Sequence, residues 1–209
     1  MRCPIHREGW FLTGMLVFFA LISSRICKYL GGFLALLAAF TAFFFRDPER
    51  EIPAGEGLIV SPADGTVLGI DTLENVPFLD GVYQRVSIFL SIFNVHINRA
   101  PIAGKIIHRQ YNPGKFFPAN APKASTDNEQ NTIVIDDKGY IVMVRQIAGI
   151  IARRILCWVN PGVSVERGER FGLIRFGSRT EIYVPASAKI EVKVGDKLQG
   201  GVTIIARRS

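Results

Sequence analysis

Two apolar runs near the start of the chain, followed by a region of short β-prone segments, most constrain its fold. The runs cover residues 10–22 and 30–45, and the polar stretch between them contains Arg25 and Lys28. Each run is shorter than the roughly 20 apolar residues that a membrane-spanning helix needs. No small-residue cleavage site of the signal-peptide kind follows the first run. We predict a membrane-associating helical hairpin within residues 1–50; a buried hairpin of a soluble protein is the alternative.

From Leu58 onward the pattern changes to β. Short runs rich in Val and Ile are separated by Gly, Pro, Asn and Asp, which favours a compact β-sandwich or partly closed barrel over residues 51–209. Two segments, Ile59–Val67 and Val194–Gly201, have the strand-turn-strand form of lipoyl or biotinyl carrier modules. The expected strands are Leu58–Val60, Thr66–Ile70, Arg85–Ile92, Thr132–Ile135, Ile141–Ile147, Ala152–Val159, Ile182–Val184, Ala188–Val194 and Val202–Ala206. Between them, residues 111–131 are expected to form one long, functional loop.

The charge of the chain indicates a membrane partner. The 209 residues carry a formal net charge of +7, and the basic residues are scattered or flank the apolar runs. Nucleic-acid binding would instead favour clustered Lys and Arg with interleaved aromatics. Basic flanks on apolar segments are attracted to an anionic membrane surface. We therefore expect such a surface, and no nucleic acid, as a partner.

The three cysteines predict neither a disulfide framework nor a metal site. Cys3, Cys27 and Cys157 are odd in number and lack CxxC or metal-ligand spacing. A reducing compartment and no bound metal are the expectations that follow.

Gly177-Ser178 is the pair with the most distinctive potential chemistry. The simplest interpretation is a tight turn between strands. However, a serine hydroxyl becomes a nucleophile when a base lies nearby. It can then attack the carbonyl of the preceding glycine and convert the peptide bond into an ester. β-Elimination of that ester would cut the chain and leave dehydroalanine, which hydrolyses to a pyruvoyl group.

Two other polar residues among the apolar runs supply what such a serine needs. His96 follows the expected strand Arg85–Ile92, and an imidazole is the usual base for a serine. Asp64 lies in Ser61–Gly65, and a carboxylate can orient an imidazole. Each alone equally fits a turn residue or a hydrogen-bonded strand-end histidine. The G-x-S-x-G elbow of an α/β-hydrolase is absent from the sequence.

Six segments in order resemble the phosphatidylserine decarboxylase proenzymes of the short form found in bacteria and archaea. Together they extend from about residue 43 to the end of the chain. They are Phe44–Arg50, Ser61–Gly65, Val95–Pro101, Tyr111–Phe116, Lys123–Asn131 and Arg170–Arg179.

The resemblance implies self-cleavage between Gly177 and Ser178, giving a β chain of residues 1–177 and an α chain of residues 178–209 that stay together as a heterodimer. Ser178 would become a covalent pyruvoyl cofactor, with no pyridoxal phosphate and no metal. Its ketone would form a Schiff base with phosphatidylserine, so that CO₂ leaves and phosphatidylethanolamine is released. Asp64, His96 and Ser178 match the family's self-cleavage set.

Two positions depart from longer members of that family. Those members carry an H-x-x-H pair where this chain has His96-Ile97-Asn98-Arg99, so His96 stands alone; His108, in a presumed strand, is the other candidate in the β chain. Arg179 replaces a threonine after the serine and adds a cation that could attract a phosphate or carboxylate. The Gly-Ser bond itself is intact.

A diacyl substrate implies an enzyme at the cytoplasmic face of the cell membrane, held there peripherally or by shallow insertion of the hairpin. Lys115, Phe116 and Phe117 are candidate substrate or bilayer contacts, with a loop that packs its own phenylalanines as the alternative. A higher homo-oligomer is also compatible with the sequence. Two other functions stay open: a membrane-tethered lipoyl- or biotinyl-like module, which would use Lys197, and a serine hydrolase that does not cleave itself.

Overall fold

The N-terminal unit, residues 1–49, is a helical hairpin. In this computed structural model, which describes residues 5–115, 127–149, 154–175 and 178–209, helix α1 covers Arg7–Ser24 and α2 covers Lys28–Phe44. Helix α1 extends beyond its apolar run at both ends, where polar groups complete it: the His6 side chain accepts a hydrogen bond from the Glu8 backbone, and the Ser24 hydroxyl donates to the Leu21 carbonyl. Pro48 follows the end of α2.

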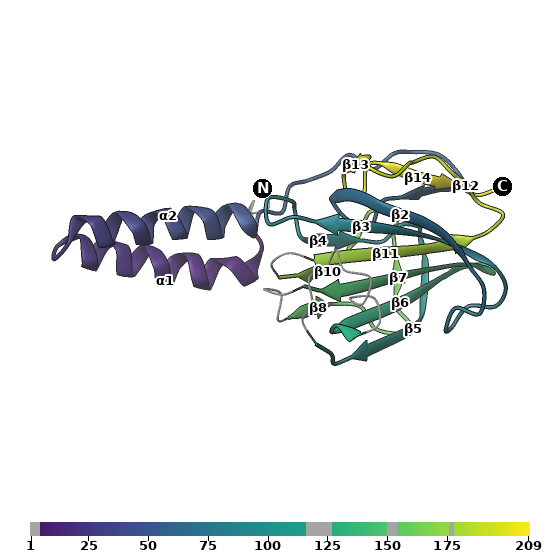
Figure 1. The fold of residues 1–209 in the computed structure, drawn as a ribbon, viewed down its shortest axis with the longest axis horizontal. Coiled ribbons are helices and arrows are strands. Elements are labelled where there is room, and N and C mark those ends of the chain that lie inside the picture. The colour runs from purple at the N-terminus through teal and green to yellow at the C-terminus, as the bar shows by residue number, and fades with distance from the viewer. Residues whose placement is uncertain (1–4, 116–126, 150–153, 176–177) are drawn as a thin grey trace. The chain divides into compact units, whose positions relative to one another are not determined.

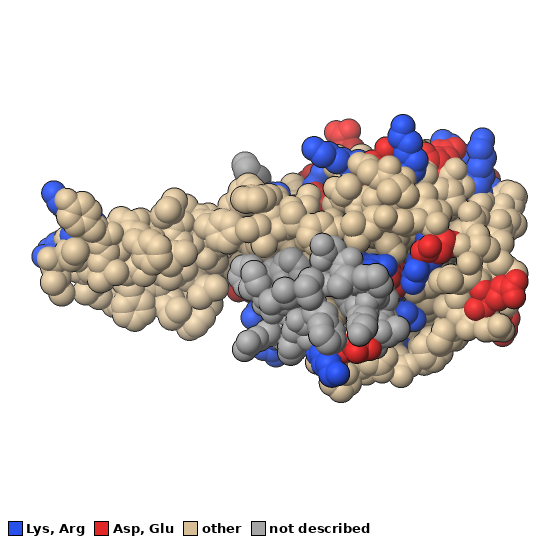
Figure 2. Space-filling model, viewed as in Figure 1, with Lys and Arg blue, Asp and Glu red and all other residues tan. Residues whose placement is uncertain are grey.

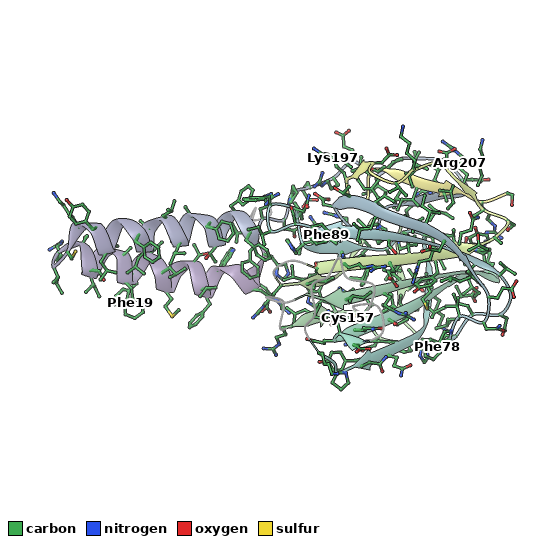
Figure 3. The ribbon with its side chains drawn as sticks, in the orientation of Figure 1. Phe19, Phe78, Phe89, Cys157, Lys197 and Arg207 are labelled. Carbon is green, nitrogen blue, oxygen red and sulfur yellow. The ribbon has the colours of Figure 1, made fainter. Side chains whose placement is uncertain are left out.

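The hairpin has small residues inside and large apolar residues outside. Gly9 and Gly31 are buried, and a Cβ on either would clash with Phe45 or with Ser24. By contrast, Phe11 is 82% exposed and Leu36 is 69% exposed. Figure 2 shows almost no charge along the hairpin surface, and Phe19 points outward from α1 in Figure 3. Among the described residues no helix is long and apolar enough to cross a membrane.

Residues 50–209 form the second unit, which is built around a curled eight-stranded antiparallel sheet. The sheet order is β13-β2-β3-β11-β7-β6-β5-β9, and β11 lies in its middle (Figure 1). These strands are β2 (Gly65–Leu73), β3 (Tyr83–Leu90), β5 (Gly104–Asn112), β6 (Gln130–Asp137), β7 (Tyr140–Ala148), β9 (Ser164–Val165), β11 (Ser178–Pro185) and β13 (Lys197–Leu198).

Two three-stranded sheets complete this unit. One has the order β4-β10-β8, from β4 (Ile97–Arg99), β10 (Arg170–Ile174) and β8 (Ile155–Cys157); the other has the order β1-β14-β12, from β1 (Leu58–Val60), β14 (Ile204–Arg207) and β12 (Lys189–Ile190). A core of Val, Ile and Leu side chains, together with Phe171, fills the inner face of the large sheet. The central strand β11 is buried at every residue from Ser178 to Val184, so both of its faces are covered.

The predicted fold class, mainly β with an N-terminal helical hairpin, is confirmed. Several boundaries were wrong. Tyr111, Asn112, Gln130 and Asn131 belong to paired strands, so the loop expected over residues 111–131 is shorter, and its residues 116–126 lie outside the described part. The strand expected over Ala188–Val194 is paired only at Lys189–Ile190, because the chain turns at Gly195. Of the strand expected over Ala152–Val159, the described pairing covers Ile155–Cys157.

Candidate functional site

Ser178 is the first residue of β11, a strand in the middle of the large sheet, and so lies at one end of that sheet. It pairs with Leu90 of β3 on one side and with Ala148 of β7 on the other. The residue is fully buried, and its Oγ has no hydrogen-bond partner among the described residues. Buried hydroxyl groups nearly always have a partner, and an exception calls for an explanation such as a chemical role.

His96 immediately precedes β4 and is also fully buried. Its Nδ1 lies 2.9 Å from the backbone oxygen of Asn94. Because a carbonyl oxygen can only accept, the neutral ring carries its proton on Nδ1 and presents a lone pair at Nε2. This tautomer is the one that a general base needs, and a backbone carbonyl orients it.

Contacts between the β4–β10–β8 sheet and the large sheet join residues near His96 to residues near Ser178. Asn98 of β4 donates to Thr180 Oγ1 of β11 at 3.2 Å. Two residues earlier on each strand, His96 accepts a backbone hydrogen bond from Ile174, and Ser178 pairs with Ala148.

Ile174 of β10 and Ala148 of β7 pack in one buried cluster, so the two sheets are also in contact at this second pair of residues. The two pairs of residues follow in the same order along β4 and β11, an arrangement compatible with the expected approach of His96 to Ser178. A direct contact between the imidazole and the serine stays a prediction.

Asp64 lies at the same end of the sheet, but its carboxylate is bound elsewhere. It accepts from the Arg50 guanidinium at 3.0 Å and from the Gly200 backbone N–H at 2.7 Å. The carboxylate therefore ties the turn before β2 to Arg50 and to the turn around Gly200, rather than to the imidazole. Its expected action on His96 stays a prediction, which would need these contacts to rearrange.

Arg179 points to the opposite face of the sheet from Ser178, as successive strand residues do. It contacts Glu181 at 2.9 Å and donates to Ser87 Oγ at 2.9 Å. Glu181 is fully buried and also accepts from the Tyr183 hydroxyl at 2.7 Å. Burial, together with the Glu181 carboxylate, raises the pKa of Tyr183 above its usual value. A substrate role for Arg179 stays a prediction; its guanidinium is paired with Glu181, which also lies within 4.0 Å of Arg85 and Arg145.

The remaining candidates lie apart from Ser178 or outside the described residues. His108 is in β5 and stacks on Phe78, with ring centroids 4.2 Å apart (Figure 3 labels Phe78). Lys197 pairs with Thr66 within β13, rather than occupying the hairpin tip that a lipoyl module needs. Lys115 is exposed and forms an isolated bridge with Asn128. Gly177, Phe116 and Phe117 fall outside the described residues.

The described part of the chain contains no group of three His, Cys, Asp or Glu side chains that could hold a metal ion. Cys27 and Cys157 are free thiols; Cys3 is not among the described residues.

The structure adds four polar residues that the sequence analysis did not propose: Asn98, Gln146, Asn131 and Thr180. All four are buried and joined by hydrogen bonds between the sheets, and we call them the buried amide network. The sequence signal was a polar residue inside an apolar strand, such as Gln146 within Ile141–Ile147. A buried polar residue requires partners, but the sequence does not reveal which they are.

Comparison with known proteins identifies the family. The model of the phosphatidylserine decarboxylase family matches residues 37–206. A phosphatidylserine decarboxylase proenzyme from Symbiobacterium thermophilum is 47% identical over 209 residues, which covers 99% of this chain and 97% of that protein. The proteins of the same name from Syntrophus aciditrophicus and Desulfotalea psychrophila are 50% and 42% identical, with 94% and 99% of this chain covered and 94% and 97% of each relative. A family match of this extent, together with relatives of 42–50% identity over nearly the whole chain, shows that the chain belongs to the phosphatidylserine decarboxylase family.

Proposed function

We propose that this chain decarboxylates phosphatidylserine to phosphatidylethanolamine and CO₂ after it has cut itself between Gly177 and Ser178. The observation that carries the proposal is the Ser178 hydroxyl, buried and without a partner among the described residues. Relatives named as proenzymes support a precursor that must be converted.

The proposed self-cleavage begins at the serine hydroxyl. His96 Nε2 takes the Oγ proton while Oγ adds to the Gly177 carbonyl carbon. The peptide C–N bond breaks, the nitrogen gains a proton, and an ester replaces the amide. Loss of the Ser178 Cα proton then breaks the Cβ–O bond, which releases the Gly177 carboxylate and leaves dehydroalanine. Its imine form takes up water and releases ammonia, so the new chain begins with a pyruvoyl group.

The residues around Ser178 fit such a group. Backbone pairing of Ser178 with Leu90 and Ala148 would hold the new terminus between β3 and β7. A pyruvoyl ketone would supply an electrophilic carbonyl for the substrate amine and an electron sink for the electrons released with CO₂. His96, whose Nδ1 is held by the Asn94 carbonyl, would return a proton to the substrate carbon. Burial of the site keeps water away from the reacting atoms.

We further propose that the hairpin attaches the enzyme to the cytoplasmic face of the cell membrane. Its outward Phe and Leu side chains would enter the lipid, while the small residues let the two helices approach closely. Arg25 and Lys28, exposed between the helices, would meet anionic headgroups. Lys115, Phe116, Phe117 and Arg179 remain proposed substrate contacts. Replacing Phe116 and Phe117 with serine should weaken binding to phosphatidylserine liposomes, and unchanged binding would remove those two residues from the proposal.

Intact mass spectrometry of the purified protein tests the central step. We expect two chains that divide after Gly177, the smaller one lighter by one ammonia than an unmodified 178–209 segment. Ser178→Ala should give one uncleaved and inactive polypeptide because it lacks the attacking oxygen, whereas Ser164→Ala, at an exposed serine, should be cleaved normally. A single intact wild-type chain that reacts with a fluorophosphonate at Ser178 would refute the proposal and favour a serine hydrolase. A lipoyl or biotin mass increment at Lys197 would refute it in favour of a carrier module.

A further inference from the structure

The buried amide network connects the strand that carries His96 to the strand that carries Ser178. Within it, Gln146 Nε2 donates to Asn98 Oδ1 at 2.7 Å, and Asn98 Nδ2 donates to Thr180 Oγ1 at 3.2 Å. Asn98 and Thr180 lie two residues after His96 and Ser178, respectively. Ser178 and Thr180 are two apart on β11 and therefore share a face, so this hydrogen bond lies beside the position at which His96 is proposed to meet Ser178.

The far end of the network is anchored away from the site. Asn131 Nδ2 of β6 donates to Gln146 Oε1 at 2.9 Å. Asn131 Oδ1 in turn accepts from Arg109 Nε at 3.4 Å. All donors in this series point the same way, so each amide orients the next and the last one delivers an N–H to Thr180. Asn98 is therefore held in one orientation by partners on two sides.

Strand β4 needs such a tie because its backbone pairing is slight. It is three residues long and, among the described strands, pairs only with β10 at the edge of its sheet. That pairing contains a register shift between Arg170 and Gly172. A short edge strand with a bulge in its ladder has few backbone hydrogen bonds to hold its position. The Asn98 side chain supplies the contact that fixes it against β11.

We propose that Asn98 is a positioning residue for self-cleavage, which sets His96 against Ser178 by hydrogen bonding Thr180 and Gln146. This inference rests on the proposed function. Asn98 touches no reacting atom; it acts by holding the strand that carries the base. A displacement of about 1 Å at a reacting group can reduce a rate roughly 100-fold, so loss of the tie should act far more on cleavage than on folding.

The test follows self-cleavage of newly made protein by gel electrophoresis, with the urea unfolding midpoint measured on the same variants. In each variant, Ser178→Ala provides an uncleaved background for the unfolding measurement. We expect Asn98→Leu and Thr180→Val to slow cleavage by about tenfold to 100-fold. Thr180→Ser keeps the hydroxyl while removing a buried methyl, so it should cleave within about threefold of wild type although it also loses stability.

Tyr183→Phe is the matched control, because it removes a buried hydroxyl that donates to Glu181 and lies on the opposite face of β11 from Ser178 and Thr180, outside the buried amide network. Its unfolding midpoint should fall, while its cleavage should stay within about threefold of wild type. If Asn98→Leu fails to fold, the nearly isosteric pair Thr180→Val and Thr180→Ser decides the question alone.

Cleavage rates that simply follow the unfolding midpoints across these variants would overturn the inference, as would normal cleavage of Thr180→Val. Failure of wild-type protein to cleave would instead refute the proposed function, so the two failures are distinguishable.

Discussion

Gly172 lets β10 pack closely against its neighbour β8 and against Gln146 of the large sheet, and Gly172→Ala should disturb the site without replacing a reacting group. A Cβ at this position would lie 2.5 Å from the backbone oxygen of Leu156 and 2.8 Å from Gln146 Nε2. Ordinary carbon contacts begin near 3.4 Å, and the first obstacle is backbone that cannot rotate away. Strand β10 must therefore shift by roughly 1 Å, a strain that typically costs about 1–3 kcal/mol in a packed core.

The shift of β10 would reach His96 through a backbone hydrogen bond. Gly172 lies two residues before Ile174, whose N–H binds the His96 backbone oxygen. We expect self-cleavage to slow by about tenfold to 100-fold. The urea midpoint of a Ser178→Ala background should fall by roughly 0.5–2 M, given m-values of about 1–3 kcal/mol per M.

Gly69→Ala in β2 is the matched control, because a Cβ there meets nothing within 4 Å. It should cleave normally and have equal or slightly higher stability, since alanine restricts the unfolded chain. Normal cleavage by Gly172→Ala, with an unchanged midpoint, would refute the view that the closeness of the two sheets sets the reacting geometry.

Two further predictions concern stability. Glu181→Leu would leave the buried Arg179 without the carboxylate that lies 2.9 Å from it, and should lower the free energy of unfolding in urea titrations by about 3–5 kcal/mol. As a control, Glu191→Leu breaks the more exposed ion pair with Arg207 and should lower the free energy of unfolding by under about 1 kcal/mol. Equal losses in the two variants would contradict the view that burial makes the Arg179–Glu181 pair the more important one. Folding raises the pKa of Tyr183, so the folded and unfolded states both keep the phenol proton below pH 10. Above pH 10 the unfolded state loses this proton first, and the free energy of unfolding should therefore fall by up to about 1.4 kcal/mol per pH unit. Urea titrations from pH 9 to 11 check this, and the slope should be shallower in Tyr183→Phe; identical slopes would mean that Tyr183 is not the group responsible.

The hairpin and the longer strands could be predicted from sequence because burial gives them long apolar runs. Strands β4, β9 and β13 have only two or three residues, too few for any period to appear. Strand β5 was expected only as a presumed strand around His108, without bounds, because Lys105, His108, Arg109 and Gln110 interrupt its apolar positions. Its partners β6 and β9 supply the pairing that its own composition does not indicate.

For the site, sequence alone could name residue types but not their partners. Ser178 and His96 were identifiable as chemistry-bearing residues among apolar neighbours. The Arg50–Asp64 ion pair and the Gln146–Asn98 hydrogen bond join residues far apart in the chain. Such contacts depend on how the sheets stack, and a single sequence does not record that stacking.

The central place of β11 gives the proposed cleavage a further meaning. Residues 178–209 supply β11 between β3 and β7, β13 beside β2, and β14 beside β1. The strands on the carboxyl side of the cut therefore pair with strands on its amino side in two of the sheets, so the two segments must fold together. A chain that misfolds would never assemble the surroundings of Ser178, and so could not generate its own reactive group. Maturation would then act as a proofreading step, in which only molecules that have completed their architecture become chemically competent.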